Sequence, residues 1–425
     1  MKILPLAIAP LLLAIPAAHA APDSATGPYA ARIAKVLKAT PLIDGHNDWP
    51  ESLSGKAGAK SWTMPLDTLD PATFHTDIQR LRAGGVGGQF WSVWVSADLP
   101  ELQQVKDTLE QIDLAHSFAR RYPGDFAFVT TAAEMRAAHK AGRIGSLLGV
   151  EGGGQIDGSM AVLRNYRALG AAYLTLTHAR TIGWADSATD NPQHGGLTPF
   201  GEAVVHELNR LGMLVDLSHV SEATMLDALR VTKAPVIFSH SNARAICDTP
   251  RNVSDAVLKQ VAANGGVVMV NFAPAYVSEA RRVWSAARSA EIARYNAPPF
   301  GGLYIGNPEG AKAALAAWEK ANPEPVVTLS QVADHIDHIV KQAGVDHVGI
   351  GSDFDGVASL PQGLTGVQTY PALLAELMRR GWSDADIARL AGDNVLRVMA
   401  AAEKVAAGMA GEPAGSGTVA SLDGA

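Results

Sequence analysis

The sequence contains a single cysteine, Cys247, among its 425 residues. One cysteine cannot form an intramolecular disulfide, so the chain is not a small domain stabilised by disulfides. A cluster of basic residues is also missing, and the 35 lysine and arginine residues are outnumbered by 42 acidic residues, which gives a net charge of -7. Nucleic-acid binding needs concentrated positive charge, so we expect no nucleic-acid partner.

Long apolar segments are scarce, and the one that exists lies at the N-terminus. Lys2 is followed by the apolar stretch 3–16 and then by Ala18-His19-Ala20. This order of positive charge, apolar core and small residues is typical of a cleaved signal peptide. We therefore predict a signal peptide at 1–20, cleaved after Ala20, and an exported protein, periplasmic or secreted. The sequence has neither a cysteine near the cleavage site nor a second long apolar segment. We therefore expect no membrane anchor.

The remaining chain divides into a long folded unit and a short tail. Residues 21–405 are long for one domain, but α/β barrels reach this size as single units. Residues 406–425 are rich in Gly, Ala and Ser. We expect this tail to be disordered because it has little apolar surface to bury.

Eight short apolar runs are candidates for buried parallel strands, which typically lack polar alternation. Six of them end in a histidine or a carboxylate: residues 41–48, 147–151, 173–178, 213–219, 236–240 and 347–353. The other two cover residues 88–95 and 266–272. Metal-ligand residue types at so many strand ends predict one shared site at the carboxyl edge of a parallel sheet.

Segments with helical periodicity alternate with these strands. They cover residues 71–84, 102–122, 132–141, 160–169, 199–211, 221–229, 254–263 and 329–342, with Ser221 and Ser254 as candidate N-caps. Eight strand–helix units predict an α/β fold, a (β/α)8 TIM-like barrel. A doubly wound open sheet is the alternative, but it would have to gather ligands from distant strands.

One connection, Ala273–Thr328 between the seventh and eighth strands, is abnormally long. Connections of this length are usually functional or contain helices of their own. Residues 279–294 have helical periodicity, and we expect the insertion to cover part of the barrel mouth.

The strand-end residues suit a metal-dependent hydrolase. His46 and Asp48 are two residues apart on an extended chain, so their side chains share one face and can bind one cation. His219 and His240 end consecutive strands, and Glu151 is placed where a carboxylate could bridge two cations. Imidazole and carboxylate are normal zinc ligands, and two cations can activate a shared water.

Two further strand-end residues are left for the substrate. We expect Asp353 to transfer a proton from that water to the leaving amine. His178 is free to polarise a carbonyl or stabilise an oxyanion. Asp44 is interpreted as a structural hydrogen-bonding residue, and Trp91 and Trp94 are interpreted as core residues.

Six motifs resemble the membrane dipeptidase (renal dipeptidase) family of zinc peptidases, in order along residues 40–400. They are Gly45-His46-Asn47-Asp48, Gly149-Val-Glu151-Gly152-Gly153, Leu176-Thr-His178, Asp216-Leu-Ser-His219, Phe238-Ser-His240-Ser241-Asn242-Ala243-Arg244 and Gly351-Ser-Asp353-Phe-Asp355-Gly356. The resemblance implies an amidohydrolase-like barrel with two Zn²⁺ ions.

The resemblance also implies a role for each site residue. His46 and Asp48 would hold one zinc, His219 and His240 the other, and Glu151 would bridge them. His178 would contact the substrate and Asp353 would transfer the proton. The resemblance further places Arg251 at the substrate carboxylate and Tyr276 in contact with the substrate.

The leading hypothesis is therefore an exported zinc dipeptidase that cleaves free dipeptides with a metal-bridged hydroxide and, by the resemblance, tolerates a D-residue at the C-terminal side. One alternative is another amidohydrolase-type reaction on a lactone, phosphoester or N-acyl amino acid. Another is a periplasmic binding protein without turnover, although every catalytic role has a candidate residue. The lipid anchor and intersubunit cysteine of mammalian members have no counterpart, and a non-covalent homodimer stays open.

Overall fold

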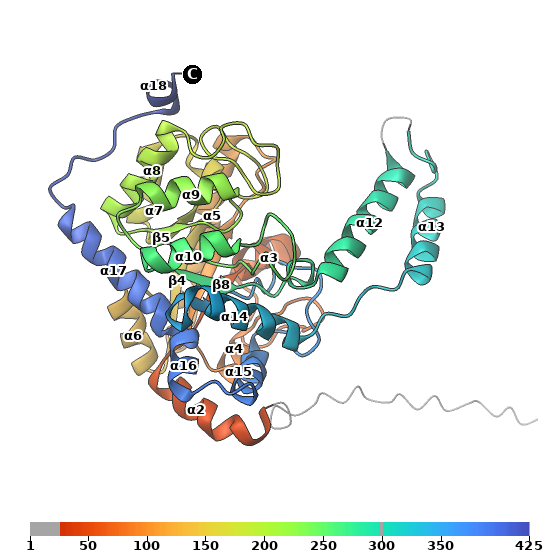
Figure 1. Ribbon diagram of the computed structural model, residues 1–425, viewed down its shortest axis with the longest axis horizontal. Coiled ribbons are helices and arrows are strands. Elements are labelled where there is room, and N and C mark those ends of the chain that lie inside the picture. Colours follow the sequence, from red (N-terminus) through yellow and green to blue (C-terminus); the bar gives the residue numbers. More distant parts are fainter. Residues whose placement is uncertain (1–25, 298–300, 425) are drawn as a thin grey trace, which may run out of the picture.

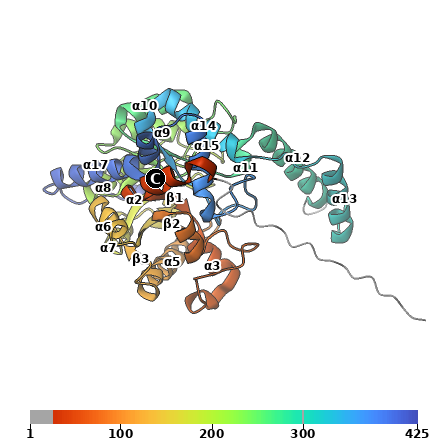
Figure 2. The same ribbon diagram turned by 90° about the horizontal axis from the view of Figure 1, so that it is seen from below.

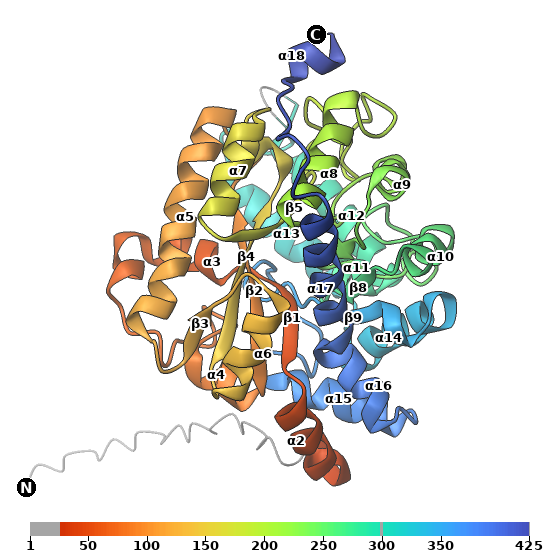
Figure 3. The ribbon, with the colours of Figure 1, turned by 90° about the vertical axis from the view of Figure 1, so that its left-hand side faces the viewer.

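Parallel strands close into a barrel at the centre of the molecule (Figure 3). The structure is a computed structural model that describes residues 26–297 and 301–424, so the predicted signal peptide, residues 1–20, lies outside the described residues. Pairing between β2 and β4 completes the ring. Its eight strands are β1 (Leu42–Asn47), β2 (Val86–Trp94), β4 (Ile144–Glu151), β5 (Ala171–Thr175), β6 (Leu214–Asp216), β7 (Ile237–Phe238), β8 (Val267–Val270) and β9 (Val348–Ile350).

These eight strands are the ones predicted from the apolar runs, and the (β/α)8 barrel is confirmed. One short strand was not predicted: β3 (Phe126–Phe128) pairs with the first residues of β4, outside the ring.

Helices alternate with the strands as predicted. They are α4 (Ile78–Ala83), α5 (Glu101–Arg121), α6 (Ala132–Lys140), α7 (Met160–Ala168), α8 (Pro199–Leu211), α9 (Glu222–Val231), α10 (Asp255–Asn264) and α14 (Leu329–Ala343). The predicted caps are confirmed, because Ser221 accepts from the Thr224 N–H and Ser254 from the Val257 N–H. The segment 71–84 is helical only from Ile78, since the side chain of Asp77 caps the helix there.

Further helices had no assignment in the sequence analysis. They are α2 (Ala30–Ala39), α3 (Trp49–Ala57), α15 (Tyr370–Arg379), α16 (Asp384–Ala388) and α17 (Asn394–Gly408). None of the helices in 26–297 and 301–424 combines the length and apolarity that a membrane span requires.

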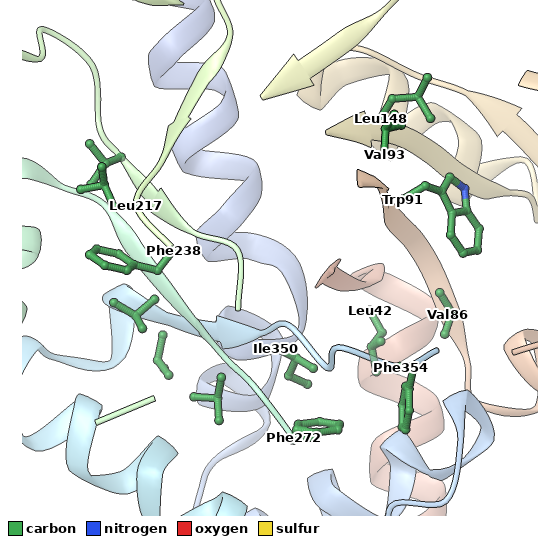
Figure 4. Packing of buried hydrophobic residues seen from close by; sticks show 14 of the residues in the cluster. Leu42, Val86, Trp91, Val93, Leu148, Leu217, Phe238, Phe272, Ile350 and Phe354 are labelled. Atoms are coloured by element: carbon green, nitrogen blue, oxygen red, sulfur yellow. The ribbon is translucent and has the colours of Figure 1, made fainter. Parts of the chain in front are cut away.

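Two apolar clusters hold the barrel together. The larger one lies between the strands and the outer helices and includes Leu42, Trp91 and Leu148 (Figure 4). The smaller one contains buried strand residues such as Ile43, Phe90 and Tyr173 together with Val395 and Met399 of α17. Side chains therefore fill the barrel and α17 packs against them, so the barrel is a packed core and not a pore.

The C-terminal tail differs from the expected disorder. Helix α17 continues to Gly408, past the predicted boundary, and α18 (Val419–Asp423) follows. Arg164 donates to the Gly415 carbonyl over 2.8 Å, and Asp423 accepts from the Phe200 N–H over 2.7 Å. The tail is positioned by these polar contacts with α7 and α8. The prediction of disorder relied on the lack of an apolar run, and polar contacts leave no such run in the sequence.

The insertion between β8 and β9 forms three helices: α11 (Pro274–Val277), α12 (Glu279–Asn296) and α13 (Pro308–Ala321). Helices α12 and α13 project from the barrel as a hairpin, which we call the arm (Figures 1 and 2). Within the described residues of its two helices, Tyr295 and Ala311 are buried. The expected cover over the barrel mouth is therefore limited to the base of the insertion, which borders the cavity described below.

A buried carboxylate links the first strand of the barrel to β2, to the residues after β9 and to α15. Asp44 of β1 accepts from Tyr370 of α15 over 2.7 Å, from Gln89 of β2 over 2.9 Å and from the Ser352 hydroxyl over 2.8 Å. Burial raises the pKa of Asp44, whereas these hydrogen bonds lower it. Asp44 thus has the structural role predicted for it.

Replacing Tyr370 by phenylalanine tests this network. The Tyr370→Phe protein should lose about 1–3 kcal/mol of unfolding free energy, because the buried carboxylate loses one of its hydrogen-bond donors. Urea denaturation followed by circular dichroism measures the change. Tyr304→Phe on the arm is the matched control, since no hydrogen bond joins the Tyr304 hydroxyl to the described residues. Equal stability of both variants and the wild type would refute a stabilising role.

Candidate active site

The predicted strand-end residues meet at one cavity of about 370 Å³ at the carboxyl end of the barrel. Asp48, Glu151, His178, His219, His240 and Asp353 all line it. The strands place them at one level: Glu151 is paired with Trp94 of β2 and with Thr175 of β5, and Thr175 is paired with Asp216 of β6. The volume suits a small ligand.

Glu151 lies at the centre of this group. Its Oε2 is 3.2 Å from His46 Nε2 and accepts from the Ser92 hydroxyl over 2.8 Å. Its Oε1 is 2.9 Å from His219 Nε2 and 3.4 Å from His240 Nε2. His46 Nε2 is also 3.3 Å from Asp48 Oδ2. The two oxygens of one carboxylate therefore face two different groups of side chains.

The imidazoles on the Oε1 side have lowered pKa values. Burial and the positive charge of Arg251 hold the pKa of His219 well below its usual range, and burial does the same for His240. The Ser239 hydroxyl donates to Asp216 over 2.6 Å, so its oxygen accepts the Nδ1–H of His240 over 2.8 Å. The Nε2 lone pair of His240 then faces Glu151 and His219, whose Nε2 is 2.9 Å away.

This arrangement fits bound metal ions. Lone pairs that face a carboxylate repel it unless a cation lies between them, and an imidazole held by its other nitrogen is typical of metal-ligating histidine. Burial lowers the pKa of His46, but the carboxylates of Glu151 and Asp48 outweigh it and raise that pKa well above its usual range. Three overlapping sets have ligand atoms within 4.8 Å of one another: His46, Glu151 and His240; Glu151, His178 and His219; His46, Asp48 and Asp353.

Asp353 is placed beside this group by an unusual backbone. Its φ is 66°, in the left-handed region, and Asn271 donates to its Oδ2 over 2.8 Å. Burial, reinforced by the negative charge of Asp48, raises the pKa of Asp353 to about 7. A carboxyl group with this pKa can both accept and release a proton near neutral pH.

Arg251 is buried with unsatisfied donors. Its Nη1 donates to the Ser241 hydroxyl over 2.9 Å, whereas Nε and Nη2 have no partner in the described part of the chain. Its guanidinium carbon lies 5.5 Å from the ring centre of Tyr276, which lines the cavity. Burial lowers its pKa. A buried guanidinium of this kind is stabilised by an anionic ligand.

The sequence model of the family described as Membrane dipeptidase (Peptidase family M19) matches residues 30–412. The chain belongs to the membrane dipeptidase family. Among solved structures, it is similar to the probable dipeptidase PvdM from Pseudomonas aeruginosa, at 26% identity and a TM-score of 0.74 over 91% of this chain and 100% of that one.

A second similar structure is a metallopeptidase from Rhodobacter sphaeroides, liganded with a phosphinate mimic of the dipeptide L-Ala-D-Ala. It is 26% identical, with a TM-score of 0.70 over 85% of this chain and 99% of that one. The family resemblance seen in the six motifs is thereby confirmed.

Several residues of the site were not recognised in the sequence. Ser92 contacts Glu151, and Asn271 contacts Asp353. Asn271 follows β8 directly, so the strand-end pattern would have found it had amides been counted with histidines and carboxylates. Trp94 was interpreted as a core residue but lines the cavity, and its ring centre is 5.4 Å from that of His178. Trp94 is the last residue of β2, and the apolar pattern of a strand does not show which of its residues borders a cavity at the strand end.

Gly356 is required by the close approach of two carboxylates. A Cβ at this position would lie 2.2 Å from Asp48 Oδ2 and 2.6 Å from Asp353 Oδ1. Asp48 is buried and Asn271 holds Asp353, so both carboxylates would have to shift from their present positions.

The Gly356→Ala protein should therefore bind divalent metal about 10–100-fold more weakly while remaining folded, because Asp48 is displaced. Elemental analysis after dialysis against a metal buffer measures the loss, and circular dichroism checks the fold. Gly183→Ala is the control, since a Cβ there meets no atom within 4 Å. Wild-type metal content in Gly356→Ala would contradict the proposed crowding.

Proposed function

We propose that the protein is an exported dipeptidase that uses two zinc ions to hydrolyse the peptide bond of free dipeptides. The observation that carries this proposal is Glu151, whose two carboxylate oxygens face two separate groups of metal-ligand side chains. Membership of the membrane dipeptidase family supports the reaction. Export is proposed from the sequence of residues 2–20 alone.

The distances support a division of the ligands. His46 and Asp48 would hold one zinc, and His219 and His240 the other, with Glu151 bridging them. His178 Nε2 is 4.0 Å from Glu151 Oε1, farther than the nitrogens of His219 and His240. We therefore assign His178 to the substrate and not to the metals.

The zinc ions, when bound, would polarise the scissile carbonyl and make a shared water nucleophilic near neutral pH. Asp353 would accept the proton of the attacking water and donate it to the leaving amine. Burial lowers the pKa of His178, which favours its neutral form, and its ring N–H would donate to the developing oxyanion. Arg251 would bind the C-terminal carboxylate, and Tyr276 would pack beside it, which favours dipeptides over longer chains.

The substrate range is proposed by comparison. The ligand of the Rhodobacter sphaeroides relative mimics L-Ala-D-Ala, which supports tolerance of a D-residue at the C-terminal side here. A different amidohydrolase-type reaction is the alternative. Many enzymes of that kind bridge their metals with a modified lysine, whereas Glu151 occupies the central position in this barrel, which favours the dipeptidase.

A substrate panel tests the reaction and its metal dependence together. The zinc-loaded protein should hydrolyse L-Ala-L-Ala and L-Ala-D-Ala but not L-Ala-L-Ala-L-Ala. A chelator should abolish turnover, zinc should restore it, and elemental analysis should find two zinc ions per chain. Turnover that survives complete removal of metal would refute the metal assignment, and equal hydrolysis of the tripeptide would refute the role of Arg251.

Asp353→Asn separates proton transfer from metal binding. The kcat for L-Ala-D-Ala should fall about 10²–10⁴-fold because the amide cannot accept the proton. The zinc content should stay at the wild-type level, as measured by elemental analysis. Asp384→Asn, an exposed substitution with the same charge change, serves as the control. Loss of zinc from Asp353→Asn would instead identify Asp353 as a metal ligand.

A further inference from the structure

The arm is tied together along one face of α12. Arg281, Trp284 and Arg288 are spaced by three and four residues, so they share this face. Arg281 pairs with Glu324, and Arg288 pairs with Glu319 over 2.7 Å. The Trp284 indole donates to the Asn322 carbonyl over 2.8 Å, and its ring centre is 5.9 Å from that of Trp318. The α13 side of the arm therefore holds the first turns of α12 in place.

Arg281 belongs to both the arm and the cavity. It lines the cavity from the first turn of α12, and its guanidinium carbon lies 4.9 Å from the ring centre of Trp284. Its Nη2 donates to Ser359, a cavity residue of the loop after β9, over 3.3 Å. The side chain is 13% exposed, so it is held in one place but remains accessible.

The guanidinium of Arg281 retains binding capacity. Arginine has five N–H groups. Within the described residues, Nε donates to Ser285, Nη2 to Ser359 and Nη1 to Glu324, which leaves one N–H on each terminal nitrogen. Glu324 is 48% exposed, so water or a competing carboxylate can reach this ion pair. Two N–H groups on one planar guanidinium suit a second carboxylate.

The position of Arg281 indicates which part of a substrate it meets. Tyr276 of α11 lies five residues before it and lines the same cavity, with its ring against Arg251. Tyr276 and Arg281 thus line the cavity from the consecutive helices α11 and α12, and Arg251 lies behind the Tyr276 ring. Strand-end carboxylates and Glu51 of α3 make other parts of the lining, and they would repel an acidic side chain.

We propose that Arg281 is a specificity-determining residue that selects dipeptides with an acidic side chain at the C-terminal residue. The proposal rests on the proposed function, because Arg251 must hold the main-chain carboxylate of that residue. Arg281 then binds the side-chain carboxylate. The insertion acts in recognition by presenting this guanidinium, whereas the barrel supplies the reacting groups.

The test compares L-Ala-L-Glu with its neutral isostere L-Ala-L-Gln on the zinc-loaded protein. The wild type should show a higher kcat/KM for L-Ala-L-Glu. Arg281→Gln should lower the ratio of the two values about tenfold or more, through KM, because a charge-assisted hydrogen bond is lost. Glu324→Gln should raise the ratio, because it removes the competing carboxylate. Arg281→Lys, which retains the charge without the planar fork, should give an intermediate ratio.

Arg282→Gln is the matched control. Arg282 is adjacent to Arg281, pairs with Glu279 and is not among the cavity-lining residues. The ratio of kcat/KM for L-Ala-L-Glu to that for L-Ala-L-Gln in this variant should therefore equal the wild-type ratio. An unchanged ratio in Arg281→Gln would overturn the proposal, and so would a loss confined to L-Glu-L-Ala. Turnover of L-Ala-L-Gln by the wild type tests the dipeptidase activity separately from the role of Arg281. Its absence in the wild type would contradict the proposed function, and this proposal with it.

Discussion

The site depends on one buried carboxylate. Glu151 is surrounded by His46, His219 and His240, whose nitrogens lie 2.9–3.4 Å from its oxygens. So many polar groups in a buried position are unfavourable unless charges and lone pairs are matched. Cations bound between the two groups of side chains would satisfy this condition. Closure of the barrel through β2 and β4 brings these strand ends to a single carboxylate, and an open sheet would separate them.

Two other buried acids orient the ligands without joining the site. Asp216 accepts from the backbone N–H groups of Ser218 and Ser239 and, through the Ser239 hydroxyl, fixes the ring of His240. Asp44 connects the ends of β1 and β9 in a similar way, because this β1 residue accepts a hydrogen bond from the N–H of Ser352, which follows β9. Each acid lies two or three residues before a histidine of the site, Asp44 before His46 and Asp216 before His219. Packing therefore sets the positions of these strand ends.

The barrel and the insertion have different physical roles. The reacting groups lie on strand ends in a packed core, where positions are held closely. The arm has few buried residues and is held by ion pairs and by Trp284 against Trp318. Such an element can change in sequence without disturbing the core, so it suits recognition of substrate side chains. The proposed role of Arg281 follows this division of labour.

The sequence by itself determined the eight barrel strands and most of the chemical groups at their ends, because buried parallel strands are continuous apolar runs and ligand residues interrupt them visibly. It did not reveal the order of the C-terminal tail, the direction of the arm, or the cavity position of Trp94. These depend on contacts between residues far apart in the chain, such as Asp423 with Phe200. Only the tertiary structure decided that Glu151 divides its oxygens between two ligand groups, because that distribution arises from the register of neighbouring strands and not from local sequence.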